Sequence, residues 1–247
     1  RLKAHFELRQ IVHRTMITAG LPESMLAKAI ETWENALPPY LKLAYLPNPG
    51  AVRLRLSAYE VEGESVSKEI ERQFEALRRI IPHNIIGYET ATMQELIHKL
   101  LTERRQTLAT AESCTGGTIA ARFTAMPGAS AYFLCGVVSY SNASKQAVLG
   151  VDPDTIARYG AVSEQVARQM AEGARRISGA DYAVSTTGIA GPAGSTAEKP
   201  VGTVWIAVAG PRRTVALLKQ CGSDRGQIID RAGAFALGLL RDELNGK

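Results

Sequence analysis

The spacing of apolar and polar residues in the first 90 positions predicts a small unit of helices and strands. Apolar residues recur at helical spacing over about residues 2–19 and 23–36, and a Gly-Leu-Pro turn separates the two segments. Apolar and polar residues alternate over 41–46 and 52–58, which predicts two strands. The Pro-Asn-Pro-Gly turn between these strands is typical of a hairpin.

A third helix completes this unit. Its apolar face consists of residues spaced three or four positions apart, namely Val66, Ile70, Phe74, Leu77 and Ile81. We expect the helix to end before Pro82, because proline lacks a backbone N–H and disfavours helical geometry at the residue before it. The sequence therefore predicts an α+β domain over residues 1–90.

From about residue 92 the chain becomes rich in Gly, Ala, Ser and Thr, and strands alternate with helices. The expected order is helix 93–103, strand 107–111, helix 118–124, strand 134–140, a short helix through 145, a helical turn after 152–153, helix 164–177 capped by Ser163, strand 182–186, a hairpin of 203–209 with 214–220, and helix 226–244. Alternation of this kind predicts an α/β layer structure over residues 91–247.

Composition places the chain among globular proteins. It has 247 residues, of which 45% are hydrophobic and 21% are charged, with a net charge of +5. No run of about 18 apolar residues and no export signal is present, so we expect a cytoplasmic protein without a membrane span. The positive charge forms no Lys/Arg cluster of the kind that a nucleic-acid duplex requires, so the sequence carries no strong signal of nucleic-acid binding.

Cysteine and histidine usage excludes several kinds of site. The three cysteines, Cys114, Cys135 and Cys221, include no CxxC pair, which fits reduced thiols better than disulfides or a zinc site. No histidine follows His98. An active site in the second half of the chain therefore has neither a Ser-His-Asp triad nor a His-ligated metal from its own residues, and we expect no metal and no cofactor.

The first candidate for chemistry is Ser113, which follows a predicted strand and precedes a helix. The residues after it, Cys114, Thr115, Gly116 and Gly117, are small and let a ligand approach the backbone closely. Unpaired N–H groups at a helix start favour anions or a developing oxyanion. A serine here suits a nucleophile, although Ser113 or Thr115 could equally serve as a helix cap.

Lys145 follows the next strand along the chain and lies at the start of a helix. Because no histidine is near, Lys145 is the candidate general base for Ser113, either directly or through the Tyr140 hydroxyl. An ordinary lysine pKa of about 10.4 leaves almost no neutral amine at pH 7, so burial must lower the pKa of Lys145. A solvated helix lysine is the alternative.

Two further segments could contact a ligand. The Gly-rich loop from Gly188 to Gly202 lacks both the GK[ST] ending of a P-loop and a following helix, but Gly188 and Gly191 could present N–H groups to an oxyanion. A simple Gly-rich turn is the alternative. Arg225, before the last helix, could bind a phosphate, or it could pair with Asp224 or Asp230.

At these segments the sequence resembles the CinA (competence/damage-inducible) family. The runs AESCTGG, VVSYSNASK, GAVSE, GIAGP and KPVGTV match, in order, the pattern of the family's C-terminal domain, which is similar to stand-alone nicotinamide mononucleotide deamidases. ESMLAKAI, LAYLPNPGAVRLRLSA and the helix around Phe74 resemble the KH-like middle region of CinA proteins. The resemblance covers essentially the whole chain.

The resemblance implies a three-layer α/β/α domain with a mixed sheet, preceded by a small α+β KH-like domain. It also implies hydrolysis of nicotinamide mononucleotide to nicotinate mononucleotide and ammonia, without metal or cofactor, in a homo-oligomer. Ser113 and Lys145 would form the catalytic pair with Tyr140, and Arg225 would bind the phosphate of this small-molecule nucleotide. A catalytically silent nucleotide-binding or adaptor module of the competence and DNA-damage response is the competing interpretation, and a different amide or ester substrate is a third.

Three features depart from the family pattern. Full-length CinA proteins also carry an N-terminal molybdopterin-binding-like domain with nucleotide pyrophosphatase activity, which this sequence does not match; since it begins at Arg1, we expect it to be a piece of a longer protein. Ser195 stands where the family commonly has glycine, which matters if that position needs a positive φ. The KH-like region lacks a GxxG loop, so the likeness implies no nucleic-acid binding.

Overall fold

The computed structural model describes residues 11–48, 51–59, 64–88 and 92–246. The chain forms two compact units, Arg1–Thr92 and Met93–Lys247. In the described residues no helix is both long and apolar enough to cross a membrane. Each unit has its own hydrophobic core.

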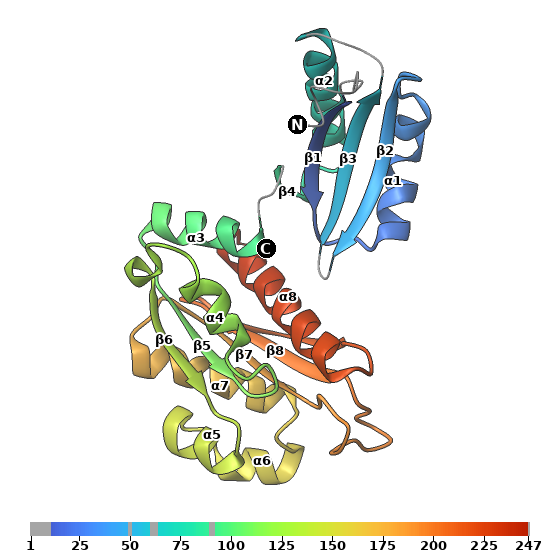
Figure 1. Cartoon of the computed structure of the whole chain (residues 1–247). Helices are drawn as coiled ribbons and strands as arrows, with labels where there is room; N and C mark the ends of the chain where they lie inside the picture. The colour runs from blue at the N-terminus through green and yellow to red at the C-terminus, as the bar shows by residue number, and fades with distance from the viewer. Residues whose placement is uncertain (1–10, 49–50, 60–63, 89–91, 247) are drawn as a thin grey trace, which may run out of the picture. The chain divides into compact units, whose positions relative to one another are not determined.

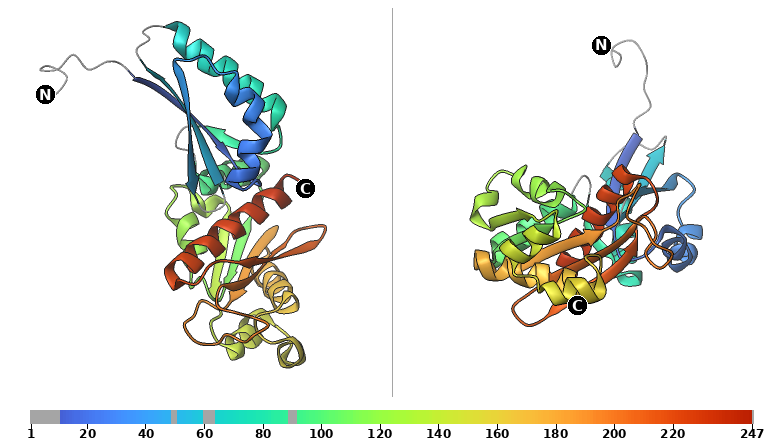
Figure 2. Two further views of the ribbon diagram at one scale, coloured as in Figure 1. Left: turned by 90° about the vertical axis from the view of Figure 1, so that its right-hand side faces the viewer. Right: turned by 90° about the horizontal axis from the view of Figure 1, so that it is seen from below.

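A four-stranded antiparallel sheet and two helices form the first unit (Figure 1). Its elements are β1 (Ile11–Thr18), α1 (Glu23–Asn35), β2 (Leu41–Asn48), β3 (Ala51–Tyr59), α2 (Glu64–Ile80) and β4 (Ile85–Tyr88). The strand order is β2-β3-β1-β4, and both helices lie on one face of the sheet (Figure 2). Ile30, Phe74 and Leu77 of the helices pack with Leu54 and Leu56 of β3.

The predicted hairpin and the two helices at 23–36 and 66–81 are confirmed, but the helix predicted at 2–19 is wrong over residues 11–18. This segment is β1, which pairs with β3 from Ile11↔Tyr59 to Thr18↔Val52. The remainder of that prediction, residues 1–10, lies outside the described residues. β4, which the sequence did not predict, pairs with the end of β1.

The second unit is a three-layer α/β/α structure around a five-stranded mixed sheet, so the predicted fold class is confirmed (Figure 1). Its elements are α3 (Met93–Arg104), β5 (Leu108–Glu112), α4 (Thr118–Thr124), a 3₁₀ turn (Ala129–Ala131), β6 (Phe133–Val138), α5 (Asn142–Leu149), α6 (Pro153–Tyr159), α7 (Glu164–Ser178), β7 (Tyr182–Gly188), β8 (Thr203–Ala209), β9 (Thr214–Gln220) and α8 (Arg225–Leu244).

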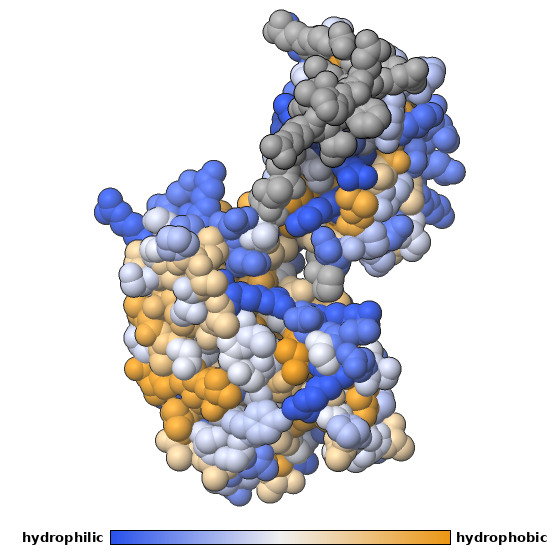
Figure 3. Space-filling view, in the orientation of Figure 1, coloured by the Kyte–Doolittle hydropathy of each residue, from blue (hydrophilic) through white to orange (hydrophobic). Residues whose placement is uncertain are grey.

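The sheet order is β6-β5-β7-β8-β9, with β6, β5 and β7 parallel and the β8–β9 hairpin antiparallel. Apolar residues of α3, α4 and α8 cover one face, and those of α7 cover the other. β5 is buried along its whole length because it lies between two strands and two helix layers. β6 is an edge strand, and its Leu134 and Val138 are exposed. Figure 3 shows apolar surface on the side of this unit where β6 lies.

This topology brings the ends of three parallel strands to one edge of the sheet. Parallel strands share a direction, so β5, β6 and β7 all end at the same edge, where α/β proteins usually bind ligands. The ends of β5 and β6 are held together by the Ser139 N–H, which donates to the Glu112 carbonyl at 2.9 Å. The end of β5 is likewise held to β7, because the Ser113 N–H donates to the Thr186 carbonyl at 3.0 Å.

Candidate active site

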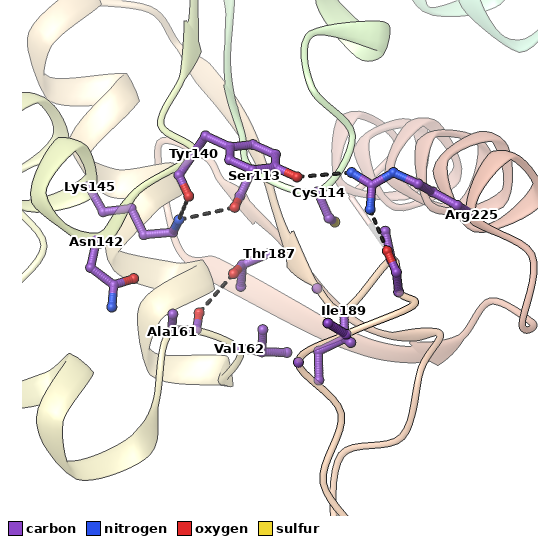
Figure 4. A pocket seen from close by; sticks show the side chains of 15 residues that line it. Ser113, Cys114, Tyr140, Asn142, Lys145, Ala161, Val162, Thr187, Ile189 and Arg225 are labelled. Atoms are coloured by element: carbon purple, nitrogen blue, oxygen red, sulfur yellow. Dashed lines mark hydrogen bonds between the residues drawn. The ribbon is translucent and has the colours of Figure 1, made fainter.

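Ser113 and Lys145 meet at this edge (Figure 4). The Lys145 Nζ lies 3.0 Å from the Ser113 Oγ and donates to the Ser139 carbonyl at 2.8 Å. Ser113 is 8% exposed and opens onto a pocket, whereas Lys145 is 1% exposed. The nucleophile candidate and its base candidate are therefore in direct contact.

The first turn of α5 positions Lys145. Ser141 and Ser144 form a reciprocal capping box, in which the Ser144 N–H donates to the Ser141 Oγ at 3.1 Å and the Ser141 N–H donates to the Ser144 Oγ at 3.2 Å. Capping of this kind fixes the direction of a short helix. Lys145, one residue later, then points toward Ser113 and the carbonyl of Tyr140 (Figure 4).

The surroundings of Lys145 favour its neutral form. In the described part of the chain Lys145 forms no ion pair, and its contacts are a hydroxyl and carbonyl oxygens. Burial lowers the pKa of Lys145, and the neighbouring Cys114 opposes this shift. Burial raises the pKa of the Cys114 thiol to about 12, so Cys114 is uncharged at neutral pH. Burial therefore shifts Lys145 toward the neutral form that a general base requires.

Glu112, the last residue of β5, organises the turn after Ser113. Its side chain is fully buried, and its two carboxylate oxygens accept hydrogen bonds from the N–H groups of Gly117 (3.0 Å), Ile119 (3.1 Å) and Ala120 (2.8 Å). These are donors at the start of α4 that a helix leaves unpaired. The protein's own carboxylate thus occupies the place where the sequence suggested a bound anion.

The residues predicted around Ser113 consequently divide into two groups. Cys114 is among the residues that line the pocket, whereas Thr115, Gly116 and Gly117 are not, and contact of these three with a ligand stays a prediction. The Thr115 hydroxyl lies 2.7 Å from both the Glu112 carboxylate and the Thr186 hydroxyl, and it is buried. Thr115 therefore holds the turn together from inside.

Arg225 lies on the opposite side of the pocket, at the start of α8. It donates to the Tyr140 hydroxyl at 2.9 Å and to the Gly191 carbonyl at 2.7 Å (Figure 4). The alternative partners predicted from sequence have other roles: Asp224 caps α8, and Asp230 pairs with Arg122. Arg225 thus has no carboxylate partner among the described residues.

Tyr140 does not connect Lys145 with Ser113. Its hydroxyl bonds to Arg225, and the oxygen that contacts Lys145 is its carbonyl, at 3.4 Å. The side chain is 61% exposed and forms part of the pocket wall. The relay through the Tyr140 hydroxyl, considered as one option from the sequence, is therefore not the arrangement observed.

Residues of the Gly-rich loop after β7, among them Gly188 and Gly191, line the pocket, and donation of their N–H groups to an oxyanion stays a prediction. A side chain at Gly188 would be impossible, because its Cβ would lie 2.7 Å from the Val204 side chain and 2.9 Å from the Thr203 carbonyl. Ser195 does not have a positive φ. A serine is therefore not strained at this position, where the family commonly has glycine.

The pocket has a volume of about 280 Å³. It also includes residues that sequence reasoning missed, among them Asn142, Ala161, Val162 and Thr187. The Thr187 hydroxyl donates to the Ala161 carbonyl at 2.7 Å and so joins the end of β7 to the segment before α7. Three of these residues could have been found from the sequence. Asn142, Ala161 and Val162 all lie within runs that carry the resemblance to the CinA family.

Comparisons with known proteins agree with this architecture. Residues 90–244 match the model of the CinA C-terminal domain, and residues 13–87 match that of the damage-inducible protein CinA KH domain. The chain belongs to the CinA family. A CinA-like protein of Flavobacterium psychrophilum is 43% identical over 99% of this chain, and one of Cytophaga hutchinsonii is 41% identical over 99%.

This CinA-family chain spans about three fifths of those relatives, covering 59% and 58% of their lengths. Among solved structures, the competence/damage inducible protein CihA from Agrobacterium tumefaciens has a TM-score of 0.60 at 41% identity, covering 62% of this chain and 93% of that one. The Escherichia coli protein ECK1530/EC0983 of the CinA superfamily has a TM-score of 0.59 at 31% identity, with 64% and 95% coverage.

Proposed function

We propose that this CinA-family chain is an amidohydrolase that converts nicotinamide mononucleotide and water to nicotinate mononucleotide and ammonia. The observation that carries the proposal is the contact of 3.0 Å between Ser113 and the buried Lys145, whose pKa burial lowers. A neutral amine beside a serine hydroxyl is a nucleophile and base pair that needs no histidine. The family resemblance supplies the choice of substrate.

In the proposed first step, the Ser113 Oγ attacks the carboxamide carbon and its proton passes to the Lys145 Nζ. The carbonyl oxygen becomes an oxyanion. Cys114 follows Ser113 directly and lines the pocket, so we assign its backbone N–H to this oxyanion. One such donor is worth about 3–4 kcal/mol in comparable enzymes.

The second half of the reaction restores the enzyme. The C–N bond breaks, the Lys145 ammonium donates its proton to the leaving nitrogen, and ammonia departs. Water then attacks the acyl-serine ester while Lys145 accepts one of its protons. Collapse of this second intermediate releases the carboxylate product, and Lys145 returns the proton to the Ser113 Oγ.

Arg225 would bind the phosphate of the nucleotide. The residues that line the pocket include no Asp or Glu, and Arg225 places a guanidinium at the pocket wall across from Ser113 and Lys145. An anionic substrate is therefore attracted with its negative end toward Arg225 and its neutral carboxamide toward Ser113.

Ammonia release from nicotinamide mononucleotide tests the proposal. The protein should release ammonia, and Ser113→Ala should reduce kcat by at least about 10³-fold because the nucleophile is lost. Ser130→Ala, at an exposed serine, is the matched control and should be unaffected. Nicotinamide and its riboside are assayed alongside to define the substrate.

Each negative outcome has a distinct meaning. Wild-type kcat in Ser113→Ala would remove the nucleophile assignment. Calorimetric binding of the mononucleotide by the wild type without ammonia release would favour the adaptor function instead.

A further inference from the structure

β6 of the second unit has one side that no other strand covers. It stands at the end of the strand order and, within the described residues, pairs with β5 alone, in a register that is regular from Cys135 onward. The Ser139 N–H donates to the Glu112 carbonyl of β5, and the backbone groups of successive strand residues point to alternate sides. The N–H and C=O groups of Gly136 and Val138 therefore point away from β5. We call this side the free edge of β6.

Large apolar side chains are exposed beside the free edge. Leu134 is 48% exposed, Val138 50% and Tyr140 61%, and Val148 of the following helix α5 is 45% exposed. They are four of the seven large hydrophobic side chains that are exposed in the described part of the second unit. The free edge and these four side chains together are called the β6 surface. Apolar side chains gathered on one surface mark a site of interaction.

The part of the chain that forms this side of the unit carries almost no charge. Residues 113–151, which include α4, β6 and α5, contain no Asp or Glu, and their cations are Arg122 and Lys145. Arg122 pairs with Asp230 of α8 at 3.2 Å, and Lys145 is 1% exposed within the candidate active site. Neither residue adds an unpaired charge to the β6 surface. An uncharged surface can meet a copy of itself without repulsion between like charges.

The opposite edge of the same sheet differs in charge. Exposed edge strands usually carry charged residues, lysine above all, which prevent pairing with another sheet. β9, at that edge, contains Lys219 and follows Arg212 and Arg213. β6 has the sequence Phe-Leu-Cys-Gly-Val-Val and contains neither a charge nor a proline. Of the two edges of this sheet, β6 is therefore the one that favours pairing with a further strand.

We propose that the β6 surface binds the β6 surface of a second copy of this chain. A two-fold axis perpendicular to the sheet at Gly136 makes the two β6 strands antiparallel, and each free edge then supplies the donors and acceptors that the other lacks. The same axis brings Val138 of each copy close to Leu134 of the other, so apolar side chains are buried on both sides of the axis. The two sheets become one continuous sheet.

The second copy would lie beside the opening of the candidate active site. Tyr140 belongs both to the β6 surface and to the residues that line the pocket. The proposal nevertheless does not depend on the proposed amidase activity, because the association of two chains is measured without substrate.

Sedimentation equilibrium of the whole chain tests the proposal. At about 100 μM protein the mass should approach twice that of one chain, which is 26.6 kDa. Buried apolar surface and backbone hydrogen bonds stabilise the contact, so raising the salt from about 0.05 to about 0.5 M should not weaken it. Leu134→Lys should raise the Kd of the dimer at least about tenfold, and Leu134→Lys/Val138→Lys at least about 100-fold, because the axis places every new charge in the interface twice.

Leu218→Lys is the matched control. Leu218 is 49% exposed on β9, so the substitution adds the same charge to an equally exposed leucine at the opposite edge of the sheet. This variant should dimerise as the wild type does. Circular dichroism and the Tm of each variant show whether it folds, and the single variant Leu134→Lys tests the surface if the double variant does not fold.

Hydrogen exchange of the wild type tests the backbone contact without a substitution. The N–H groups of Gly136 and Val138 point away from β5, so they exchange rapidly in a single copy. On peptides that contain these residues, exchange should slow at least about tenfold between about 1 μM and about 100 μM protein, because the second copy supplies acceptors.

Three results would overturn the proposal. The first is the mass of a single chain at about 100 μM protein. The second is a dimer that Leu218→Lys weakens as much as Leu134→Lys does. The third is a dimer in which exchange at Gly136 and Val138 does not slow with concentration, because the two copies would then meet through another surface.

Discussion

Replacing Lys145 by methionine tests the central electrostatic claim about the site. Methionine has a similar length and no charge, so it fills the same buried space without a titrating group. The variant should lose ammonia release, because no base remains beside Ser113. Its folding stability should also respond to pH differently from that of the wild type, because burial lowers the pKa of Lys145.

The size of this effect follows from proton binding. The unfolded chain keeps Lys145 protonated up to about pH 10.4, whereas the folded protein releases that proton at a lower pH. Between these two values the unfolded state binds one more proton, so the wild type gains about 1.4 kcal/mol of stability per pH unit as pH rises. Lys145→Met has no such gain. Relative to the wild type, the free energy of unfolding of Lys145→Met should therefore fall by about 1.4 kcal/mol per pH unit between the folded and unfolded pKa values of Lys145. Below the folded pKa the difference between the two proteins should stay constant.

Denaturant unfolding at about pH 7 to 10 measures this difference. The chain has two tryptophans, so in a Trp33→Phe background the fluorescence of Trp205 reports the second unit alone. Lys99→Met is the control, since the Lys99 side chain is 71% exposed. A difference between Lys145→Met and wild type that stays constant over the whole range, or that changes equally in Lys99→Met, would refute the reasoning.

Two further substitutions test the pocket wall and the turn. Arg225→Ala should raise KM for nicotinamide mononucleotide about 10- to 150-fold, because a charge-assisted hydrogen bond is worth about 1.5–3 kcal/mol, and should leave the kinetics of the riboside unchanged. An equal effect on both substrates in steady-state assays would contradict phosphate binding. Glu112→Ala should lower the free energy of unfolding by about 3 kcal/mol or more, since three buried N–H groups lose their acceptor. A loss below about 1 kcal/mol in denaturant titrations would show that water replaces the carboxylate.

β1 shows how far local pattern determines structure. Its residues Ile11, Val12, Thr15, Ile17 and Thr18 are β-branched, which favours a strand, yet their spacing also fits a helix. The choice is made by β3, which follows about 35 residues later and pairs with all eight residues of β1. β4 has only four residues, too few for a period to be recognised.

The site could be predicted in part for a simple reason. Ser113 and Lys145 each follow a strand, and strand ends are recognisable in sequence even when the order of strands is not. Side-chain direction is a different matter. Whether Glu112 turns beneath the loop, or the Tyr140 hydroxyl turns toward Arg225, depends on α4 and α8, and no local pattern encodes it.

Because of Glu112, holding the turn in shape and binding an anion are separate tasks in this site, whereas many anion-binding loops combine them. The turn that holds Ser113 is closed on the protein's own carboxylate, so its geometry does not depend on which substrate is bound. Under the proposed function, Arg225 would select the charge of the substrate, and a distant part of the chain supplies it at the start of α8. If the proposed function holds, substitutions at the start of α8 would change the preferred substrate while the reaction at Ser113 stays the same.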